Sequence, residues 1–376
     1  MSLDLTGILN DNEFYTHHYL SAILENDIKG IFSTWKEKEK EHNIRPPYSA
    51  LRALHKEFFA LQARLGTERK DKTRLKDQTE FHEKLFSTLG YEMGFQYIVL
   101  DDGLSLPLMG SVCKPNGAPD VWFVQALDEA GEANDPLTLT LKKTQYERDE
   151  GEEKNKEIPQ TMTFEDVINR QIFALSEPPR WVIIASDSQV LLIDRQKWSE
   201  KRLLRFDLKE ILGRRETSTL QTMAALLHHD SVCPQDSIPF LDTLDENSHK
   251  HAFSVSEDLK YSLRRSIELI GNEAVWYMQE VKHEKVFGRD LADQLTRESL
   301  RYMYRLLFLF YIEARPELGY APIKSDAYRQ GYSLDFLREL EMVQLTTEES
   351  RQGYYLDQSI TLLFELMYNG FNHKRD

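Results

Sequence analysis

The chain has 376 residues, 41% of them hydrophobic and 29% charged, with a formal net charge of −15. This composition predicts a globular protein of two or three domains. Because the net charge is negative, any contact with nucleic acid must come from a locally basic part of the surface. Two cysteines, Cys113 and Cys233, exclude a disulfide framework and a four-cysteine zinc site. We find no pattern typical of a secretory signal or a membrane span, and we therefore expect a cytoplasmic protein without membrane contact.

The first 77 residues are predicted to be helical. Apolar residues recur at helical spacing from Asn12 to His42 and again from Tyr48 to Leu65, with Pro46-Pro47 between the two segments. A basic stretch then leads to a further helix, from Gln78 to Leu89, which Gly90 should end. We expect residues 1–77 to form a domain of amino-terminal helices.

Short strands are predicted from Phe95 onward, in "FQYIVLDDG", "LSLPLMGSVC", "PDVWFVQAL" and "LTLTLKK". A helix capped by Thr163 follows, and "RWVIIASDSQVLLIDRQKW" predicts a hairpin of two buried strands around Asp187-Ser188. We expect residues 78–215 to form an α/β domain.

The remainder, residues 216–376, is predicted to be all-helical. Helices are expected at Glu216 to His228, from a cap at Ser254 or Ser256 to Met278, and at Asp290 to Ala314, with two shorter ones after that. The fold class is therefore α/β plus all-α, with a helical bundle as the last domain.

The strand block raises the question of a nuclease, because a β-hairpin with an Asp on one strand and acid-x-Lys on the next can hold Mg²⁺ beside a phosphodiester. Asp120 opens a strand as such a motif would. Its partner is either "TLK", ending at Lys142, or "QAL", beginning at Gln125. Both alignments lack the second acid, so the candidate site of Asp120, Gln125 and Lys142 is degenerate. Mg²⁺ would be needed only if nuclease activity survived.

Two stretches are locally basic and are the candidates for phosphate contacts, although a solvated charged face is the alternative for each. The candidate DNA-binding residues are Arg64, Arg69, Lys70, Lys72, Arg74 and Lys76 in the first stretch, and Arg195, Lys197, Lys201, Arg202, Arg205, Arg214 and Arg215 in the second. The histidines complete no recognised ligand spacing, so we expect no zinc site.

Three stretches carry a resemblance to a known group. They are "RYMYRLLFLFYIEARPELGYAPI" followed by "YRQGYSLDFLREL", then "PPRWVIIASDSQVLLIDRQKW" with "LLRFDLKEIL", and "LDENSHKHAFSVSEDLKYSLRRSIELIGNE". Together they cover most of residues 178 to 340. This sequence resembles the region ahead of the methyltransferase domain in large type IIG-like restriction-modification and phage-defence adenine-specific DNA methyltransferases.

The resemblance implies a degenerate restriction-endonuclease-like domain of the PD-(D/E)xK type, with a mixed sheet and flanking helices, joined to a helical connector. It implies a role in DNA engagement and scaffolding, with weak binding of double-stranded DNA by this chain alone. The methyltransferase domain, in cis or as another defence-system protein, would be the partner, and S-adenosylmethionine is expected only there. Two alternatives stay open: an active Mg²⁺-dependent DNA endonuclease, and a non-enzymatic protein-interaction module of a defence system.

The apolar run Leu306 to Ile312 ends on Glu313 and Arg315. Its apolar residues surround the helix axis, which predicts a central core helix. Charges beside a core persist when they are paired, so we expect Arg305, Glu313 and Arg315 to join neighbouring helices rather than to catalyse a reaction.

Overall fold

The computed structural model describes residues 4–67, 71–128, 133–146, 156–235, 237–286, 288–339, 343–351 and 353–370. The chain divides into two compact units, Met1–Ser254 and Val255–Asp376. The boundaries expected at residues 77 and 215 fall inside the first unit, because helices on both sides of each boundary share one hydrophobic core with the sheet.

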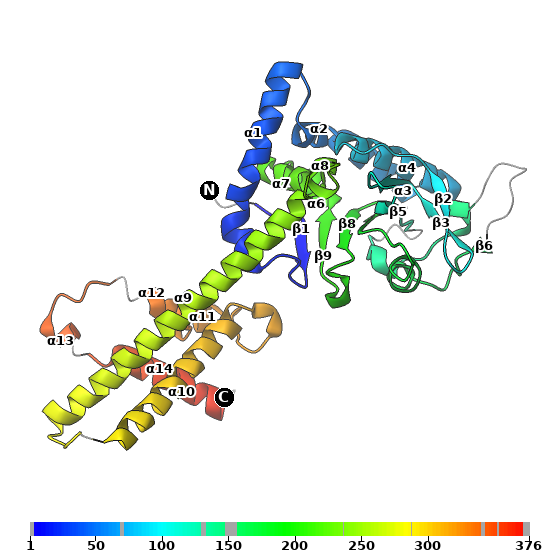
Figure 1. Cartoon of the computed structure of the whole chain (residues 1–376). Helices are drawn as coiled ribbons and strands as arrows, with labels where there is room; N and C mark the ends of the chain where they lie inside the picture. The colour runs from blue at the N-terminus through cyan, green and yellow to red at the C-terminus, as the bar shows by residue number, and fades with distance from the viewer. Residues whose placement is uncertain are drawn as a thin grey trace, which may run out of the picture. The chain divides into compact units, whose positions relative to one another are not determined.

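Six of the described strands of the first unit form a mixed sheet in the order β1-β9-β8-β7-β5-β4 (Figure 1). The strands β5 and β7 run parallel, and the other neighbours in this sheet run antiparallel. A smaller sheet has the order β2-β3-β6. The bounds are β1 Ile8–Asp11, β2 Gln96–Val99, β3 Leu104–Leu108, β4 Gly110–Cys113, β5 Pro119–Gln125, β6 Lys156–Glu157, β7 Trp181–Ala185, β8 Gln189–Asp194 and β9 Leu203–Asp207.

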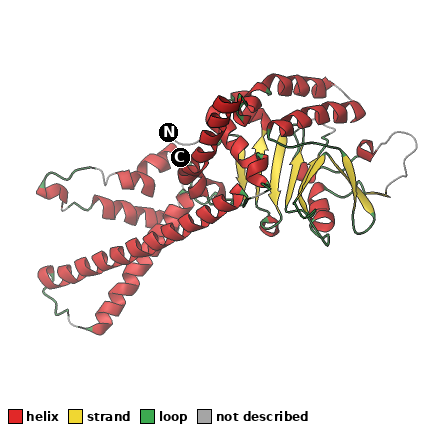
Figure 2. Ribbon diagram, turned by 45° about the horizontal axis from the view of Figure 1, so that its top comes forward, coloured by secondary structure: helices red, strands yellow, loops and turns green. Residues whose placement is uncertain are grey.

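Both faces of the large sheet are covered, since alternate residues of one strand enter different cores. Along β7, Trp181 and Ile183 belong to one core, while Val182 and Ile184 belong to the other. Helices accordingly lie on both sides of the strands (Figure 2). The helices that contribute to the first core are α1 Leu24–His42, α2 Pro47–Ala53, α3 His55–Thr67, α4 Asp71–Thr88, α6 Leu208–Arg214, α7 Thr217–Leu227, α8 His229–Val232 and the start of α9 Phe240–Trp276.

The second core lies under α5 Phe164–Val167, which continues as a π-helix, Ile168–Ile172. Thr163 caps α5, since its hydroxyl accepts a hydrogen bond from the Asp166 N–H at 3.2 Å. Gly90 follows α4 with a φ of +86°, a conformation that favours glycine. The expected mixed sheet with flanking helices, this cap and the β7–β8 hairpin are confirmed.

Two expected elements are wrong. "LTLTLKK" forms no strand; its segment contains short 3-10 helices at Pro136–Thr138 and Lys143–Tyr146, and Thr140 makes one isolated bridge. The turn begins there because the Asp135 carboxylate accepts a hydrogen bond from the Leu137 N–H at 3.0 Å. The helix expected to start at Ser254 or Ser256 begins at Phe240 instead, so both serines lie inside α9.

The second unit is helical in its described part. After α9 and the π-helix Tyr277–Val281 come α10 Arg289–Glu313, a 3-10 turn Pro316–Leu318, α11 Asp326–Gly331, α12 Leu334–Glu339, α13 Glu348–Arg351 and α14 Tyr355–Asn369. Its core is small and consists of Leu309, Ile312, Ala321, Leu334, Leu337 and Leu363 with their half-buried neighbours. Among the described helices, none combines the length and apolarity needed to cross a membrane.

Candidate functional site

The three candidate nuclease residues do not converge. Asp120 and Gln125 stand near opposite ends of β5, five residues apart, which is roughly 16 Å along a strand. Asp120 Oδ1 lies 3.8 Å from Lys114 Nζ. Burial raises the pKa of the Asp120 carboxyl above its usual value, and the cations of Lys114 and Arg180 oppose that increase. One metal ion could not bridge Asp120 and Gln125.

The register of the β4–β5 hairpin also places no second acidic residue near Gln125 that could replace the missing ligand of a metal site. Gly110 of β4 pairs with Phe123, and the Met109 N–H donates to the Phe123 carbonyl at 2.9 Å. Leu108 and Met109 therefore lie across from the Gln125 end of β5, and both are apolar. The described residues contain no group of three His, Cys, Asp or Glu side chains that could hold a metal. The residues present at this hairpin do not fit an Mg²⁺ site.

Lys142 does lie near Gln125, through an intermediate residue. Its N–H donates to Gln145 Oε1 at 2.9 Å, and Gln145 Nε2 donates to the Gln125 carbonyl at 2.9 Å. Gln125 Oε1 also accepts a hydrogen bond from the Thr79 hydroxyl at 3.0 Å. The structure thus brings the Lys142 segment, Gln125 and α4 together and leaves Asp120 elsewhere.

A cavity of about 400 Å³ opens at this end of β5. Gln125 and Gln145 are buried at its wall, and the Thr144 hydroxyl is buried without a hydrogen-bond partner. Lys72 and Lys76, one helical turn apart on α4, supply positive charge. The lining residues are Lys72, Leu75, Lys76, Thr79, Glu80, Glu83, Phe95, Pro107, Met109, Gln125, Thr144 and Gln145. Its size and mixed lining are those of a ligand-binding cavity, so this is the candidate site of the first unit.

Arg74, a candidate DNA contact, is buried beside this site. Only 4% of its surface is exposed, and its guanidinium donates to the carbonyl oxygens of Leu65 at 2.6 Å and Asp128 at 2.7 Å. Gln78, one turn further along α4, donates to the Ala126 carbonyl at 2.9 Å. These bonds attach α4 to the segment that follows β5, so Arg74 positions the helix rather than meeting a phosphate.

A similar attachment follows β7. His82 Nε2 lies 2.8 Å from the Ser186 carbonyl oxygen, which can only accept, so Nε2 carries the proton of a neutral ring. Burial lowers the pKa of His82 to about 4. Burial and the neighbouring Asp128 carboxylate raise the pKa of Asp187 to about 6, against the effect of Arg74. The carboxyl ends of β5 and β7 are thus held under α4 by buried polar groups, and no local sequence pattern predicts this cluster.

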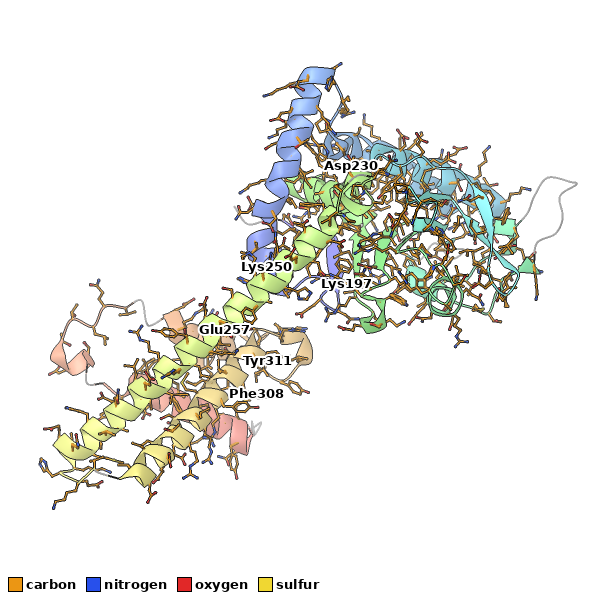
Figure 3. All side chains as sticks on the ribbon, viewed as in Figure 1. Lys197, Asp230, Lys250, Glu257, Phe308 and Tyr311 are labelled. Carbon is orange, nitrogen blue, oxygen red and sulfur yellow. The ribbon has the colours of Figure 1, made fainter. Side chains whose placement is uncertain are left out.

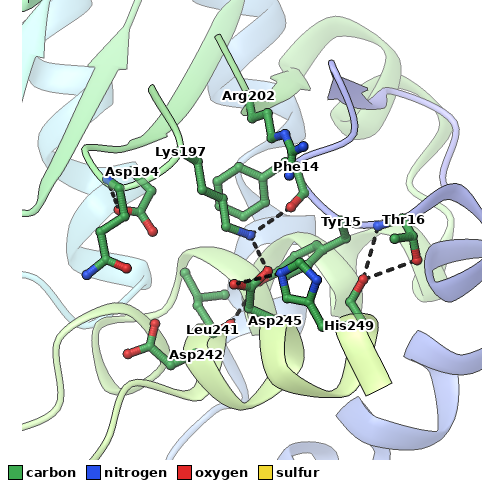
Figure 4. Close-up of polar contacts among 12 residues, drawn as sticks. Phe14, Tyr15, Thr16, Asp194, Lys197, Arg202, Leu241, Asp242, Asp245 and His249 are labelled. Carbon is green, nitrogen blue, oxygen red and sulfur yellow. Dashed lines mark hydrogen bonds and ion pairs between the residues drawn. The ribbon is translucent and has the colours of Figure 1, made fainter. Parts of the chain in front are cut away.

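Two residues of the second basic stretch, Lys197 and Arg205, also make contacts within the protein. Lys197 has 11% of its side chain exposed; it pairs with Asp245 and donates to the Phe14 carbonyl at 2.7 Å (Figure 4). Arg205 has 12% exposed and pairs with Asp11 at 3.1 Å and Asp135 at 2.9 Å. Lys197 and Arg205 would have to break these pairs to reach a phosphate.

Most of the other basic candidates are nearer the surface. Lys201 pairs with Glu165, Arg202 with Glu200, Arg214 with Asp4, and Arg64 with Asp77. Arg195 and Arg215 are exposed. Arg69 and Lys70 lie outside the described residues. Lys72 and Lys76, beside the cavity, are the candidates that combine exposure with a defined site.

Comparisons with protein-family models, curated proteins and solved structures find no match for this chain. The functional argument therefore depends on the residues and their geometry.

In the second unit, Glu313 joins three helices. Its carboxylate at the end of α10 accepts hydrogen bonds from the Tyr328 hydroxyl at 2.8 Å, the Leu334 N–H at 3.0 Å and the Asp335 N–H at 3.2 Å. It therefore caps α12 from another helix and also holds α11. The Arg305 guanidinium lies 5.8 Å from the centre of the Phe364 ring of α14, and Arg315 follows the end of α10 half-buried.

The expected central core position of α10 is wrong within this unit. Leu309 and Ile312 are buried, but Leu300, Tyr304, Phe310 and Tyr311 are exposed. Figure 3 labels Tyr311 on α10. The physical reason is that the small core of the second unit covers one face of α10 only. The apolar residues around the axis were visible in the sequence, whereas the size of the core was not.

Proposed function

We propose that this chain is the DNA-engaging and scaffolding part of an adenine-specific DNA methyltransferase system of the restriction-modification or phage-defence type. The methyltransferase, in cis or as a separate protein, carries the chemistry and binds S-adenosylmethionine. In this proposal the first unit is a degenerate restriction-endonuclease-like domain without cleavage activity, and the second is the helical connector. The resemblance over residues 178 to 340 supports the identity of the partner.

The observation that carries the proposal is the uncovered face of α10. Tyr304 and Tyr311 lie seven residues apart, on the side of the helix away from Leu309, and expose 69% and 53% of their surfaces. A helix that is apolar all round is ordinarily buried, because exposed aromatic surface costs free energy in water. A scaffold that receives a folded methyltransferase domain on this face accounts for both tyrosines.

The proposed DNA contact is restricted to Lys72 and Lys76, with Arg64 as a further exposed base. Two phosphate contacts are few, so we expect weak binding that falls roughly 60-fold between about 20 and 200 mM salt. That behaviour agrees with the acidic net charge of the chain.

The test has two arms, both with the full chain. Size-exclusion chromatography with light scattering should show a one-to-one complex with an adenine methyltransferase domain of the resembled group. The variant Tyr304→Ser/Tyr311→Ser should lose that complex. The matched control, Tyr354→Ser/Tyr355→Ser, removes two exposed tyrosines elsewhere and should keep it. Absence of any complex with the unmodified chain would refute the scaffold.

In the second arm, fluorescence anisotropy measures binding to a labelled duplex. Lys72→Ala/Lys76→Ala should weaken binding at least about tenfold at low salt. Lys36→Ala/Lys40→Ala, with the same spacing on α1, should not. No binding at about 20 mM salt, or equal losses in both pairs, contradicts DNA engagement. A complex with the methyltransferase domain but no affinity for DNA would select the second candidate, a protein-interaction module, which the exposed tyrosines also favour.

A further inference from the structure

A groove in the second unit lies between α10 and α14 and has a volume of about 560 Å³. Phe308, at its rim, lies about one helical turn from both Tyr304 and Tyr311, so the groove adjoins the face that these tyrosines form. Phe308, Met367 and Tyr368 are exposed at the groove, and Tyr368 leaves 90% of its surface uncovered. The lining residues are Arg305, Phe308, Leu309, Thr361, Phe364, Glu365, Met367, Tyr368 and Asn369. Such a rim of aromatic and Met side chains is typical of an interaction surface.

Two opposite charges line this apolar groove, Arg305 from α10 and Glu365 from α14. They form no ion pair with each other, and within the described residues neither is paired with another charged side chain. The Arg305 guanidinium instead lies over the Phe364 ring. Both charges are therefore available to a molecule that enters the groove.

We infer that the groove is the interface of a twofold symmetric dimer of this chain. In such an isologous interface, a contact between residues i and j occurs twice with the roles exchanged. Arg305 of one copy then meets Glu365 of the other, and Glu365 meets Arg305. A helix from an unrelated acidic partner would pair with Arg305 but would repel Glu365. A basic partner would pair with Glu365 but would repel Arg305. A second copy pairs both at once.

The available area fits a dimer of moderate stability. Phe308, Met367 and Tyr368 together leave roughly 350 to 400 Å² uncovered, taking about 200 Å² for a fully exposed large side chain. The exposed Arg305, Thr361, Glu365 and Asn369 bring the groove to roughly 600 to 700 Å² per copy by the same reckoning. The total for two copies is near the lower end of the range for specific interfaces, about 1,200 to 2,000 Å², so association should occur at about micromolar concentration.

Sedimentation velocity of the full chain, from about 1 to 100 µM, tests this inference. We expect a concentration-dependent equilibrium of monomer and dimer. Arg305→Glu and Glu365→Arg should each weaken the dimer at least about tenfold, because each places two like charges together twice. The exchanged variant Arg305→Glu/Glu365→Arg should recover the original affinity to within about threefold. Arg264→Glu, an exposed residue of α9 with the same charge change, should have no effect.

Circular dichroism of each variant verifies that helix content is retained. A chain that stays monomeric at about 100 µM overturns the inference. So does a dimer that tolerates both single charge reversals, since it must use another face. If the single variants disrupt the dimer and the exchange does not restore it, the Arg305 to Glu365 pairing is wrong. None of these outcomes depends on a methyltransferase or on DNA.

Discussion

Replacing Glu313 with Ala should destabilise the second unit. The carboxylate accepts hydrogen bonds from the Tyr328 hydroxyl and from two N–H groups at the start of α12. Loss of a helix cap costs about 1 kcal/mol, and loss of a hydrogen bond to a charged acceptor costs about 1.5 kcal/mol or more. Since water can reach the exposed Asp335 N–H, we expect a total loss of about 2 to 3 kcal/mol.

Differential scanning calorimetry of the full chain measures this effect. For a unit of this size, roughly 4 °C per kcal/mol gives a decrease of about 8 to 12 °C in the melting temperature of the second unit. Glu313→Gln keeps an acceptor oxygen and loses the charge, so about 1 kcal/mol should be lost. The control is Glu298→Ala on the same helix, where an exposed pair with Arg301 should contribute less than about 0.5 kcal/mol.

Hydrogen exchange places the damage within the unit. In Glu313→Ala, the amides of α11 and α12 should exchange faster, because those are the elements that the carboxylate holds. A melting temperature within about 2 °C of the original, or equal losses in Glu313→Ala and Glu298→Ala, would refute the reasoning.

The remaining predictions concern the first unit. Asp187 has a raised pKa of about 6, so its contribution to stability is present below pH 4 and is lost as the pH rises through 6. Asp187→Asn should therefore raise the free energy of unfolding by about 2 kcal/mol at pH 7 and change it little at pH 4. His82 has a lowered pKa of about 4, so its contribution to stability is fully present above pH 6.5 and is lost as the pH falls through 4. His82→Gln should therefore lose less stability than the original protein when the pH is lowered. When the free energy of unfolding in urea is plotted against pH from 4 to 7, its slope should have opposite signs in the two variants. Parallel plots would contradict the roles given to Asp187 and His82. Lys197→Met should lower the free energy of unfolding by about 2 kcal/mol, because it removes the buried cation beside Asp245. Lys201→Met should lower it by less than about 1 kcal/mol, since that pair is exposed. Duplex binding should be unchanged in both variants, and a loss of DNA affinity in Lys197→Met would show that Lys197 contacts phosphate after all.

The sequence predicted those elements whose signal is local. The β7–β8 hairpin has two continuous apolar runs around a turn, and Thr163 carries its own cap pattern. The strand β1, by contrast, has four residues and exists because β9 pairs with it from nearly 200 residues away. "LTLTLKK" has the alternation of a strand, but Asp135 starts a turn before a neighbouring strand can pair with it. In both cases, the presence or absence of a neighbouring strand determined whether a strand formed, and the β-propensity of the segment did not.

The candidate site was less predictable, because burial and pairing of charges depend on distant residues. Arg205 reads as one of a basic series, yet Asp135 reaches it across 70 positions. Arg74 sits between exposed Lys72 and Lys76 in the sequence, and the helix turns it alone toward the carbonyl of Asp128. The sequence singles out Gln125 as a neutral residue in an acid position, but it could not show that Met109 lines the same cavity.

The internal pairing of Lys197, Arg205 and Arg74 also bears on how the protein behaves among nucleic acids. DNA and RNA are an abundant polyanion, and a protein with a free basic surface is retained on them without regard to sequence. This chain encloses these three basic side chains, and its acids outnumber its bases. We therefore expect weak retention of this chain on nucleic acid of arbitrary sequence, so a long residence at one site would require a bound partner in addition to the proposed Lys72 and Lys76 contacts.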